Sequence, residues 1–287
     1  MDRRELLKSA LAGTVTLIFP SLLCGQANKI AIVDGGGTNV VAFSSTDGLI
    51  LVDSGAPMKT LATSGKVTTV FNTHYHLDVT GNNEQFASLG AKIIAHKRTL
   101  EWMSADHWVP TEERYEKARP KAARPTETFL TTGSLKIGSE QIDYGYLTLA
   151  HTNGDIYVFF RNANVLAVGD VASPLRDPAL DYLTGAWIGG RVDSMDTLLK
   201  IANEQTRIVP AYGPTMSKAE FKAERDMMEM VRDRLFKQVR EGDGPKDMLD
   251  AGVLKGLPRT WKDPYKFLYD AAKGLWAHHD KLGPNVV

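Results

Sequence analysis

The residues best suited to chemistry lie in loops that directly follow predicted strands. His74, His76 and Asp78 alternate along one such loop, and His151 and Asp170 each follow a later strand. In an extended chain, residues two apart point to the same face, so two imidazoles and a carboxylate can converge. Imidazole and carboxylate groups together suit a divalent metal of the zinc type. The spacing therefore predicts a metal centre; the alternative is that the histidines are hydrogen-bonded core residues.

Short strands that alternate with helices must position these loops. Apolar, β-branched runs between Gly, Ser and Asp turns predict strands, whereas helically spaced apolar residues predict helices. The predicted strands are residues 30–33, 40–44, 49–52, 67–71, 92–95, 127–130, 135–137, 141–147, 156–161, 165–168 and 207–209. The predicted helices are residues 82–89, 97–104, 195–203, 218–241, 245–251 and 264–278.

The sequence also predicts one irregular segment and the number of domains. Residues 105–126 are polar and hold three prolines, which predicts an irregular lid or insertion. No linker composition interrupts residues 28–287, so we expect one α/β domain with a helical C-terminal region.

Four segments resemble motifs of the metallo-β-lactamase superfamily and follow one another in the same order along the chain. They are residues 51–55, 73–81, 151–155 and 169–170, and the resemblance extends over nearly all of the chain after residue 27. It implies an αββα sandwich, in which two mixed sheets lie face to face, helices lie outside, and metals bind at one edge between the sheets. It also implies that His74, His76 and His151 form a first metal site. Asp78 and Asp170 then correspond to the carboxylates of a second site, where Asp170 bridges the two metals.

Two positions depart from the family pattern, and both affect the second metal. Val79 stands where the His-x-His-x-Asp-His motif ends in histidine, and Tyr212 stands where a later histidine is expected. Two carboxylates and a phenol suit zinc poorly. We therefore expect one tightly held metal in the three-histidine site, with the second site weak or empty. Zinc is the leading candidate, although iron and manganese also suit three imidazoles. Tyr212 is predicted either to bind metal or to donate a hydrogen bond at the pocket wall.

This site predicts hydrolytic chemistry. A metal held by three histidines keeps a position open for water, lowers the pKa of that water and can polarise a carbonyl. Asp78 would orient or deprotonate the water, and Asp170 would hold its other hydrogen or protonate the leaving group. The leading hypothesis is a hydrolase for the ester, lactone, thioester or β-lactam carbonyl of a small molecule. The resemblance also allows an accessory metalloprotein of a periplasmic oxidation system, and loss of the two histidines allows a non-catalytic metal- or ligand-binding protein.

Several aromatic residues are candidates for the pocket wall. His107 and Trp108 lie in the predicted lid, and Trp187 precedes a helical segment. Pockets are lined mainly by apolar and aromatic groups, but core packing is an equally good explanation for the two tryptophans. His96 either lies near the site or caps a helix. The resemblance implies that Asp53 supports a metal ligand through a hydrogen bond.

Composition and charge exclude several classes of protein. The 287 residues include 34 basic and 34 acidic side chains and one cysteine. Binding to nucleic acid would need an excess of Lys and Arg, so it is not expected. One cysteine excludes a disulfide framework and any Cys-x-x-Cys site.

Residues 1–27 resemble an export signal. Arg3 and Arg4 precede an apolar stretch, and residues 25–27 fit a small-x-small cleavage site. The order of residues resembles a twin-arginine signal, which implies the twin-arginine export machinery as a partner and a periplasmic or secreted protein. The apolar stretch is short for a membrane span, so no stable anchor is expected after cleavage. Cys24 would leave with the signal, which suits an oxidising compartment.

Overall fold

Two β-sheets form the centre of the computed structural model, which describes residues 29–57, 65–110 and 113–278. The predicted export signal lies outside these ranges. The first sheet has six strands in the order β1-β2-β3-β4-β5-β8. Strands β1 to β3 pair antiparallel, and β3, β4, β5 and β8 pair parallel. The strands of this sheet are β1 (Lys29–Asp34), β2 (Asn39–Ser45), β3 (Gly48–Val52), β4 (Val67–Phe71), β5 (Lys92–His96) and β8 (Glu127–Phe129).

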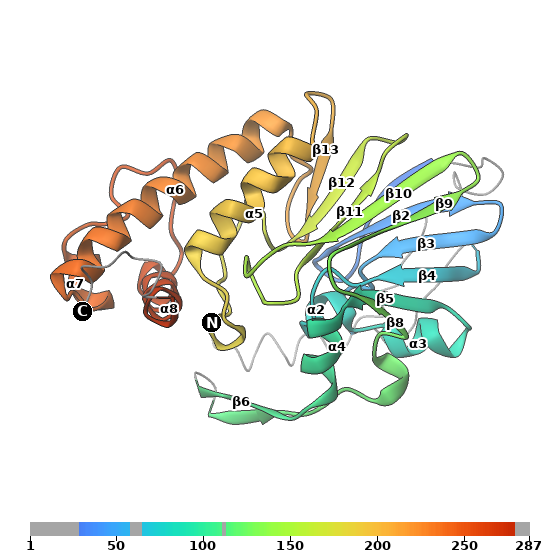
Figure 1. Ribbon diagram of the computed structural model, residues 1–287, viewed down its shortest axis with the longest axis horizontal. Coiled ribbons are helices and arrows are strands. Elements are labelled where there is room, and N and C mark those ends of the chain that lie inside the picture. The colour runs from blue at the N-terminus through green and yellow to red at the C-terminus, as the bar shows by residue number, and fades with distance from the viewer. Residues whose placement is uncertain (1–28, 58–64, 111–112, 279–287) are drawn as a thin grey trace.

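The second sheet has five strands in the order β13-β12-β11-β10-β9. Its pairs are antiparallel except for β12 with β13, which run parallel. Its strands are β9 (Thr132–Ile137), β10 (Glu140–Tyr146), β11 (Ile156–Phe160), β12 (Val165–Gly169) and β13 (Arg207–Pro210). Figure 1 shows the two sheets lying against each other.

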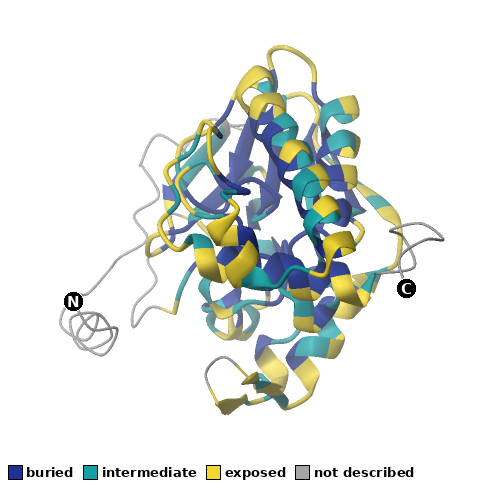
Figure 2. Ribbon diagram, turned by 90° about the vertical axis from the view of Figure 1, so that its left-hand side faces the viewer, coloured by how far each residue is buried: buried dark blue, intermediate teal, exposed yellow. Residues whose placement is uncertain are grey.

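The apolar core occupies three layers because the sheets are covered on both faces. Phe43 of β2 and Phe160 of β11 pack between the sheets, whereas Ala42 of β2 faces the opposite side with Phe86. This alternation follows from the two-residue period of a strand. Strands buried on both faces are continuous apolar runs, as the sequence predicted for β3 and β12. Figure 2 shows the central strands of the sandwich as buried and the helices with an exposed outer face.

Helices cover both outer faces of the sheets. The short helix α3 packs on the first sheet, the long helices α5 and α6 pack on the second, and α8 packs against α5 and α6. A capping box at Ser217 and Glu220 begins α6, and Gly242 ends it in the left-handed conformation. This arrangement confirms the predicted αββα sandwich. The helices are α2 (Leu77–Thr80), α3 (Asn83–Ser88), α4 (Lys97–Ser104), α5 (Ile188–Ile201), α6 (Lys218–Glu241), α7 (Pro245–Asp250) and α8 (Pro264–Ala277).

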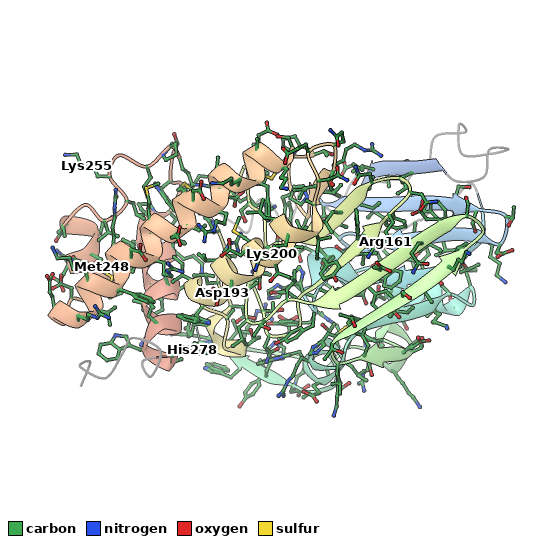
Figure 3. The ribbon with its side chains drawn as sticks, turned by 45° about the horizontal axis from the view of Figure 1, so that its top comes forward. Arg161, Asp193, Lys200, Met248, Lys255 and His278 are labelled. Atoms are coloured by element: carbon green, nitrogen blue, oxygen red, sulfur yellow. The ribbon has the colours of Figure 1, made fainter. Side chains whose placement is uncertain are left out.

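The C-terminal helices extend the molecule well beyond the sheets. In Figure 3, Met248 of α7 and Lys255 mark the helical end, and Arg161 marks the sheet end. Asp193 and Lys200 of α5 lie between them. None of the helices in the described ranges combines the length and the apolar character needed to cross a membrane.

Two details differ from the sequence prediction. The segment 105–126 is not wholly irregular, since it contains the hairpin β6 (His107–Val109) and β7 (Arg114–Glu116) and a 3-10 turn at Lys121–Ala123. Helix α5 begins at Ile188 rather than at residue 195. Glycine discouraged a helical prediction there. Gly190 is needed because a Cβ at this position would lie 2.4 Å from the carbonyl oxygen of Leu149.

Candidate metal centre

Three histidines converge at the edge where strands of both sheets end. His74 and His76 lie in the loop between β4 and α2, and His151 lies in the loop between β10 and β11. One potential ligand atom from each imidazole lies within 4.8 Å of the other two. The closest pair is His76 Nδ1 and His151 Nε2, which are 3.1 Å apart. The structure thus brings together the three histidines that the sequence predicted as metal ligands, and they could hold a metal ion.

In two of these imidazoles, those of His74 and His151, the nitrogen that points away from the centre forms a hydrogen bond. His151 Nδ1–H donates to the carbonyl oxygen of Ala179 at 2.9 Å. The Thr73 hydroxyl donates to the Asp53 carboxylate at 2.9 Å and lies 3.1 Å from His74 Nδ1, so it accepts from Nδ1–H. Each of these hydrogen bonds leaves Nε2 with a free lone pair, which is the form of histidine that binds a metal.

The third imidazole, that of His76, faces the centre through Nδ1 instead of Nε2. His76 Nε2 lies 3.5 Å from Asp181 Oδ2, which also accepts a hydrogen bond of 2.7 Å from the Tyr75 hydroxyl. A carboxylate can only accept, so Nε2 carries the hydrogen and Nδ1 is available as a ligand. His74 Nε2 is buried and has no hydrogen-bond partner in the described part of the chain. A buried polar atom without a partner needs an explanation, and a metal ion at the centre supplies one.

The protonation states favour neutral ligands at two positions. Burial lowers the pKa of His74 well below its usual value, and burial together with the nearby His76 lowers the pKa of His151. For His76, burial acts in the same direction, but the hydrogen bond and charge of Asp181 outweigh it and the pKa is raised. His74 and His151 are therefore already deprotonated near neutral pH, whereas His76 keeps its proton to a higher pH than a free imidazole, and that proton competes with a metal.

Asp170 stands beside the three histidines at the end of β12. Its Oδ2 lies 3.7 Å from His74 Nε2 and 3.5 Å from His151 Nε2. Burial, and next the charge of Asp78, raise the pKa of Asp170 to about 6. The preceding Gly169 has a φ of 56°, and a Cβ there would lie 2.8 Å from the Cβ of Thr73. Glycine therefore lets the end of β12 approach the histidine loop closely.

Asp78 is paired with Tyr212 across the two sheets. The Tyr212 hydroxyl donates to Asp78 Oδ2, while Asp78 Oδ1 is buried without a partner among the described residues. Burial and the charge of Asp78 raise the pKa of Tyr212 above its usual value, so the phenol stays protonated. Tyr212 is thus a hydrogen-bond donor to Asp78 but does not line the cavity, and metal binding by Tyr212 stays a prediction.

Apolar packing occupies the region where the family resemblance predicts the two missing histidines. Val79, Ala211 and Tyr212 form a small buried cluster. The guanidinium carbon of Arg176 lies 3.1 Å from the centre of the Tyr212 ring. Within the described ranges, this cluster offers no imidazole for a second metal between Asp78 and Asp170.

A cavity of about 230 Å³ opens beside His76 and His151. The β6–β7 hairpin, the loop of residues 179–183 and helix α8 line it. Its walls combine apolar, aromatic and charged groups: Tyr75, His107, Val109, Arg114, Glu116, Ala179, Leu180, Asp181, Tyr182, Leu183, Lys266 and Asp270.

The structure separates the predicted pocket residues. His107 lines the cavity, but Trp108, Trp187 and Tyr212 are not among its lining residues. Trp108 packs on Tyr115 of the hairpin, and Trp187 stacks on Phe236 and on His278. His96 accepts a hydrogen bond from the backbone nitrogen of Arg98 and thus caps α4.

Sequence reasoning did not identify Asp181 or Tyr75. Tyr75 stands between two predicted ligands, which is a usable signal, since it lines the same cavity and donates to the carboxylate that His76 faces. Asp181 lies in a segment without periodic pattern, so its approach to His76 follows from tertiary packing alone.

Comparisons with known proteins agree with this fold. The sequence model of the metallo-β-lactamase superfamily matches residues 33–213, so the chain belongs to that superfamily, as its motifs predicted. Among curated proteins, no sequence matches the chain.

Solved structures show the same fold at low sequence identity. A metallo-β-lactamase from Pontibacter korlensis is similar with a TM-score of 0.54 and 18% identity, over 70% of this chain and 93% of that one. A superfamily protein from the archaeon Sulfolobus tokodaii has a TM-score of 0.52 and 13% identity, over 71% of this chain and 87% of that one. A double mutant of the sec-alkyl sulfatase PisA1 has a TM-score of 0.61 and 11% identity, over 90% of this chain and 51% of that one.

Proposed function

We propose that this protein is a mononuclear zinc hydrolase that cleaves an ester, lactone, thioester or β-lactam carbonyl of a small molecule. One observation carries the proposal: three imidazoles each engage an outer partner and direct the remaining nitrogen to one centre, beside an open cavity. Membership of the superfamily supports a metal-dependent hydrolase-type function.

The ligand set fits zinc. The ion would be held by His74 Nε2, His76 Nδ1 and His151 Nε2. These nitrogens face one another, and the second nitrogen of each ring points to a group outside the centre. Three protein ligands with one position left open are characteristic of catalytic zinc sites. When bound, such an ion supplies a water of lowered pKa and polarises the substrate carbonyl.

The two carboxylates orient and move protons. Asp170 is ionised at neutral pH, because its pKa of about 6 lies below it, and its Oδ2 faces the histidine centre. It can therefore accept a hydrogen from a water held there. Asp78 Oδ1 has no partner among the described residues, so it is the acceptor available for the proton that the water loses. Tyr212 holds Asp78 in place through Oδ2.

The cavity limits the size and chemistry of the substrate. A volume of about 230 Å³ suits a small molecule, and the tyrosine and leucine side chains offer an apolar wall. The related solved structures include β-lactamases and a sec-alkyl sulfatase, so β-lactams and a secondary alkyl sulfate belong among the substrates to test.

We also propose that the protein is exported by the twin-arginine machinery and acts in the periplasm or outside the cell. The support is the Arg3-Arg4 pair ahead of a short apolar stretch. Substituting both arginines by lysine should leave the precursor in the cytoplasm, as measured by cell fractionation. Export at the wild-type level would refute the proposal.

Metal analysis and substrate assays test the function together. Purified protein should contain one zinc per chain and hydrolyse at least one of a panel of aryl esters, lactones, thioesters, β-lactams and sec-alkyl sulfates. His151→Ala should lose the metal and the activity. His96→Gln is the matched control, since His96 is also buried but stacks on Tyr146 away from the centre, and it should keep both.

Two outcomes would contradict this proposal. One zinc per chain without turnover of any substrate would favour an accessory metalloprotein. No bound metal in the wild-type protein would favour a non-catalytic binding protein.

A further inference from the structure

A completely buried arginine lies behind the metal centre. Arg191 is in the first turns of α5 and is among the largest fully buried side chains of the described residues. Burying a charge is costly unless it is paired and hydrogen-bonded. The contacts of Arg191 therefore indicate what this charge does for the protein.

Arg191 binds the loop that connects β12 to α5. Its Nη2 donates to the hydroxyl of Ser173 at 2.8 Å, and its Nη1 donates to the carbonyl oxygen of Ala179 at 3.3 Å. Glu224 of α6 supplies the counter-charge, with its Oε1 at 3.9 Å from Nη2. The same carboxylate oxygen accepts a hydrogen bond of 2.8 Å from the backbone nitrogen of Ser173.

The Ala179 carbonyl joins Arg191 to the metal centre. This oxygen accepts the Nδ1–H of His151 at 2.9 Å as well as the guanidinium. A carbonyl oxygen has two lone pairs, so it can serve both donors. The bond to His151 selects the tautomer that presents Nε2 to the metal, and the bond to Arg191 holds the carbonyl where it can do so.

Several elements hold this loop. Residues 172–181 contain no helix or strand, yet Ala179 orients His151 and Asp181 orients His76. Arg259 donates from Nη2 to the carbonyl oxygen of Ser173 at 2.7 Å, and the backbone nitrogens of residues 262 and 263 donate to the Asp177 carboxylate. Arg191 differs from these anchors because it binds the Ala179 carbonyl itself.

We propose that Arg191 is a positioning residue for the metal centre, which acts through the Ala179 carbonyl to fix the orientation and tautomer of His151. The proposal rests on the proposed function insofar as the three histidines must hold a metal. It does not depend on which substrate is hydrolysed, or on whether turnover is found. Groups that orient metal-bound histidines typically change metal affinity or activity by about 10- to 100-fold when they are removed.

The test must separate positioning from general stability. Arg191→Met alone removes one of the two guanidinium groups that face Glu224 and leaves Arg259, whose Nη2 lies 3.7 Å from Oε1. To keep the buried charges balanced, the informative variant combines Arg191→Met with Glu224→Gln. Glutamine keeps an oxygen that accepts from the Ser173 nitrogen. Glu224→Gln alone is the first control. Arg225→Met is the second, because Arg225 also links α6 to α5, through Asp196, but does not contact the loop.

Two readouts report on the metal centre without any substrate. Zinc affinity is measured by competition with a chromophoric chelator, and the geometry of the site is read from the visible spectrum of the cobalt-substituted protein. We expect the double variant to bind zinc about 10- to 100-fold more weakly and to show altered cobalt bands. Both controls should keep the wild-type affinity and spectrum. Arg191→Lys retains the charge and should fold, but one ammonium cannot replace both guanidinium bonds, so we expect an intermediate affinity.

Several results would overturn the proposal. Wild-type zinc affinity and cobalt spectrum in the double variant would show that Arg191 only stabilises the fold. If the double variant does not fold, wild-type values in Arg191→Lys would overturn the proposal instead. A wild-type protein that binds no metal would refute the proposed function and this inference together, whereas a metal-binding protein without turnover would refute only the hydrolase.

Discussion

Replacing Asp181 by asparagine should weaken metal binding at the third histidine. Asp181 Oδ2 accepts the Tyr75 hydroxyl at 2.7 Å and lies 3.5 Å from His76 Nε2. A carboxylate can only accept, so it requires the hydrogen of His76 to be on Nε2 and leaves Nδ1 free for a metal. An amide presents both donors and acceptors, so Asp181→Asn no longer selects this tautomer.

The expected loss of zinc affinity follows from the distance between Asp181 and His76. A hydrogen bond to a charged group contributes about 1.5–3 kcal/mol. The separation of 3.5 Å is at the long limit for such a bond, which places this one at the lower end of the range. Since about 1.4 kcal/mol corresponds to a factor of ten, we expect Asp181→Asn to weaken zinc binding about tenfold at high pH.

The pH dependence should distinguish this cause from others. Burial acts to lower the pKa of His76, but Asp181 outweighs it, so in the metal-free protein His76 is still protonated somewhat above its usual pKa. Protons compete with the metal, so wild-type affinity should fall as the pH drops through this raised pKa. Without the Asp181 charge, burial is opposed by the charges of Asp78 and Asp170 alone, so the pKa of His76 drops and the fall in affinity moves to lower pH. The affinities of wild type and variant should therefore converge as the solution is acidified.

Chelator competition at a series of pH values measures both effects. Calorimetry in buffers of different ionisation enthalpy would count the protons that zinc displaces near neutral pH. We expect proton release from the wild type and less from Asp181→Asn. Equal affinities at high pH, or an unchanged pH midpoint, would refute the assigned role of Asp181.

Three further variants test neighbouring parts of the site. Thr73→Val leaves the buried Nδ1–H of His74 without its acceptor and removes one hydrogen bond to Asp53. The free energy of unfolding of the metal-free protein in urea should fall by about 1–3 kcal/mol, and an unchanged midpoint would contradict this. Val79→His combined with Tyr212→His should raise the zinc content from one to two per chain by native mass spectrometry, whereas a single zinc would show that the apolar cluster is not what excludes the second ion. Gly169→Ala places a Cβ against Thr73 at a positive φ and should lower thermal stability together with zinc affinity; a variant as stable as the wild type would refute the need for glycine.

Strand runs were the part of the fold that the sequence predicted well. Val67–Phe71 forms β4 over the predicted residues, because β-branched and aromatic residues favour a strand. Helix α6 also has the predicted bounds, since Ser217, Glu220 and Gly242 supply recognisable signals at its two ends. Such signals are local and can be recognised in one sequence.

The features that were missed depend on contacts between distant segments. The start of α5 contains Gly190, which lowers helix propensity locally but allows close packing against Leu149. In the site, the spacing of His74 and His76 predicted their convergence. The roles of Asp181 and Arg191 could not be predicted in this way, because Asp181 lies in a loop without a repeating pattern and Arg191 of α5 reaches His151 only through the Ala179 carbonyl of that loop.

The central claim is that His74, His76 and His151 hold one metal. Each histidine binds it through the nitrogen that points toward the other two histidines. Anomalous diffraction from crystals of the zinc-loaded protein tests it most directly. We predict one strong peak per chain, about 2.0–2.1 Å from His74 Nε2, His76 Nδ1 and His151 Nε2. A second peak of similar height beside Asp78 and Tyr212, or no peak among the three histidines, would contradict the account.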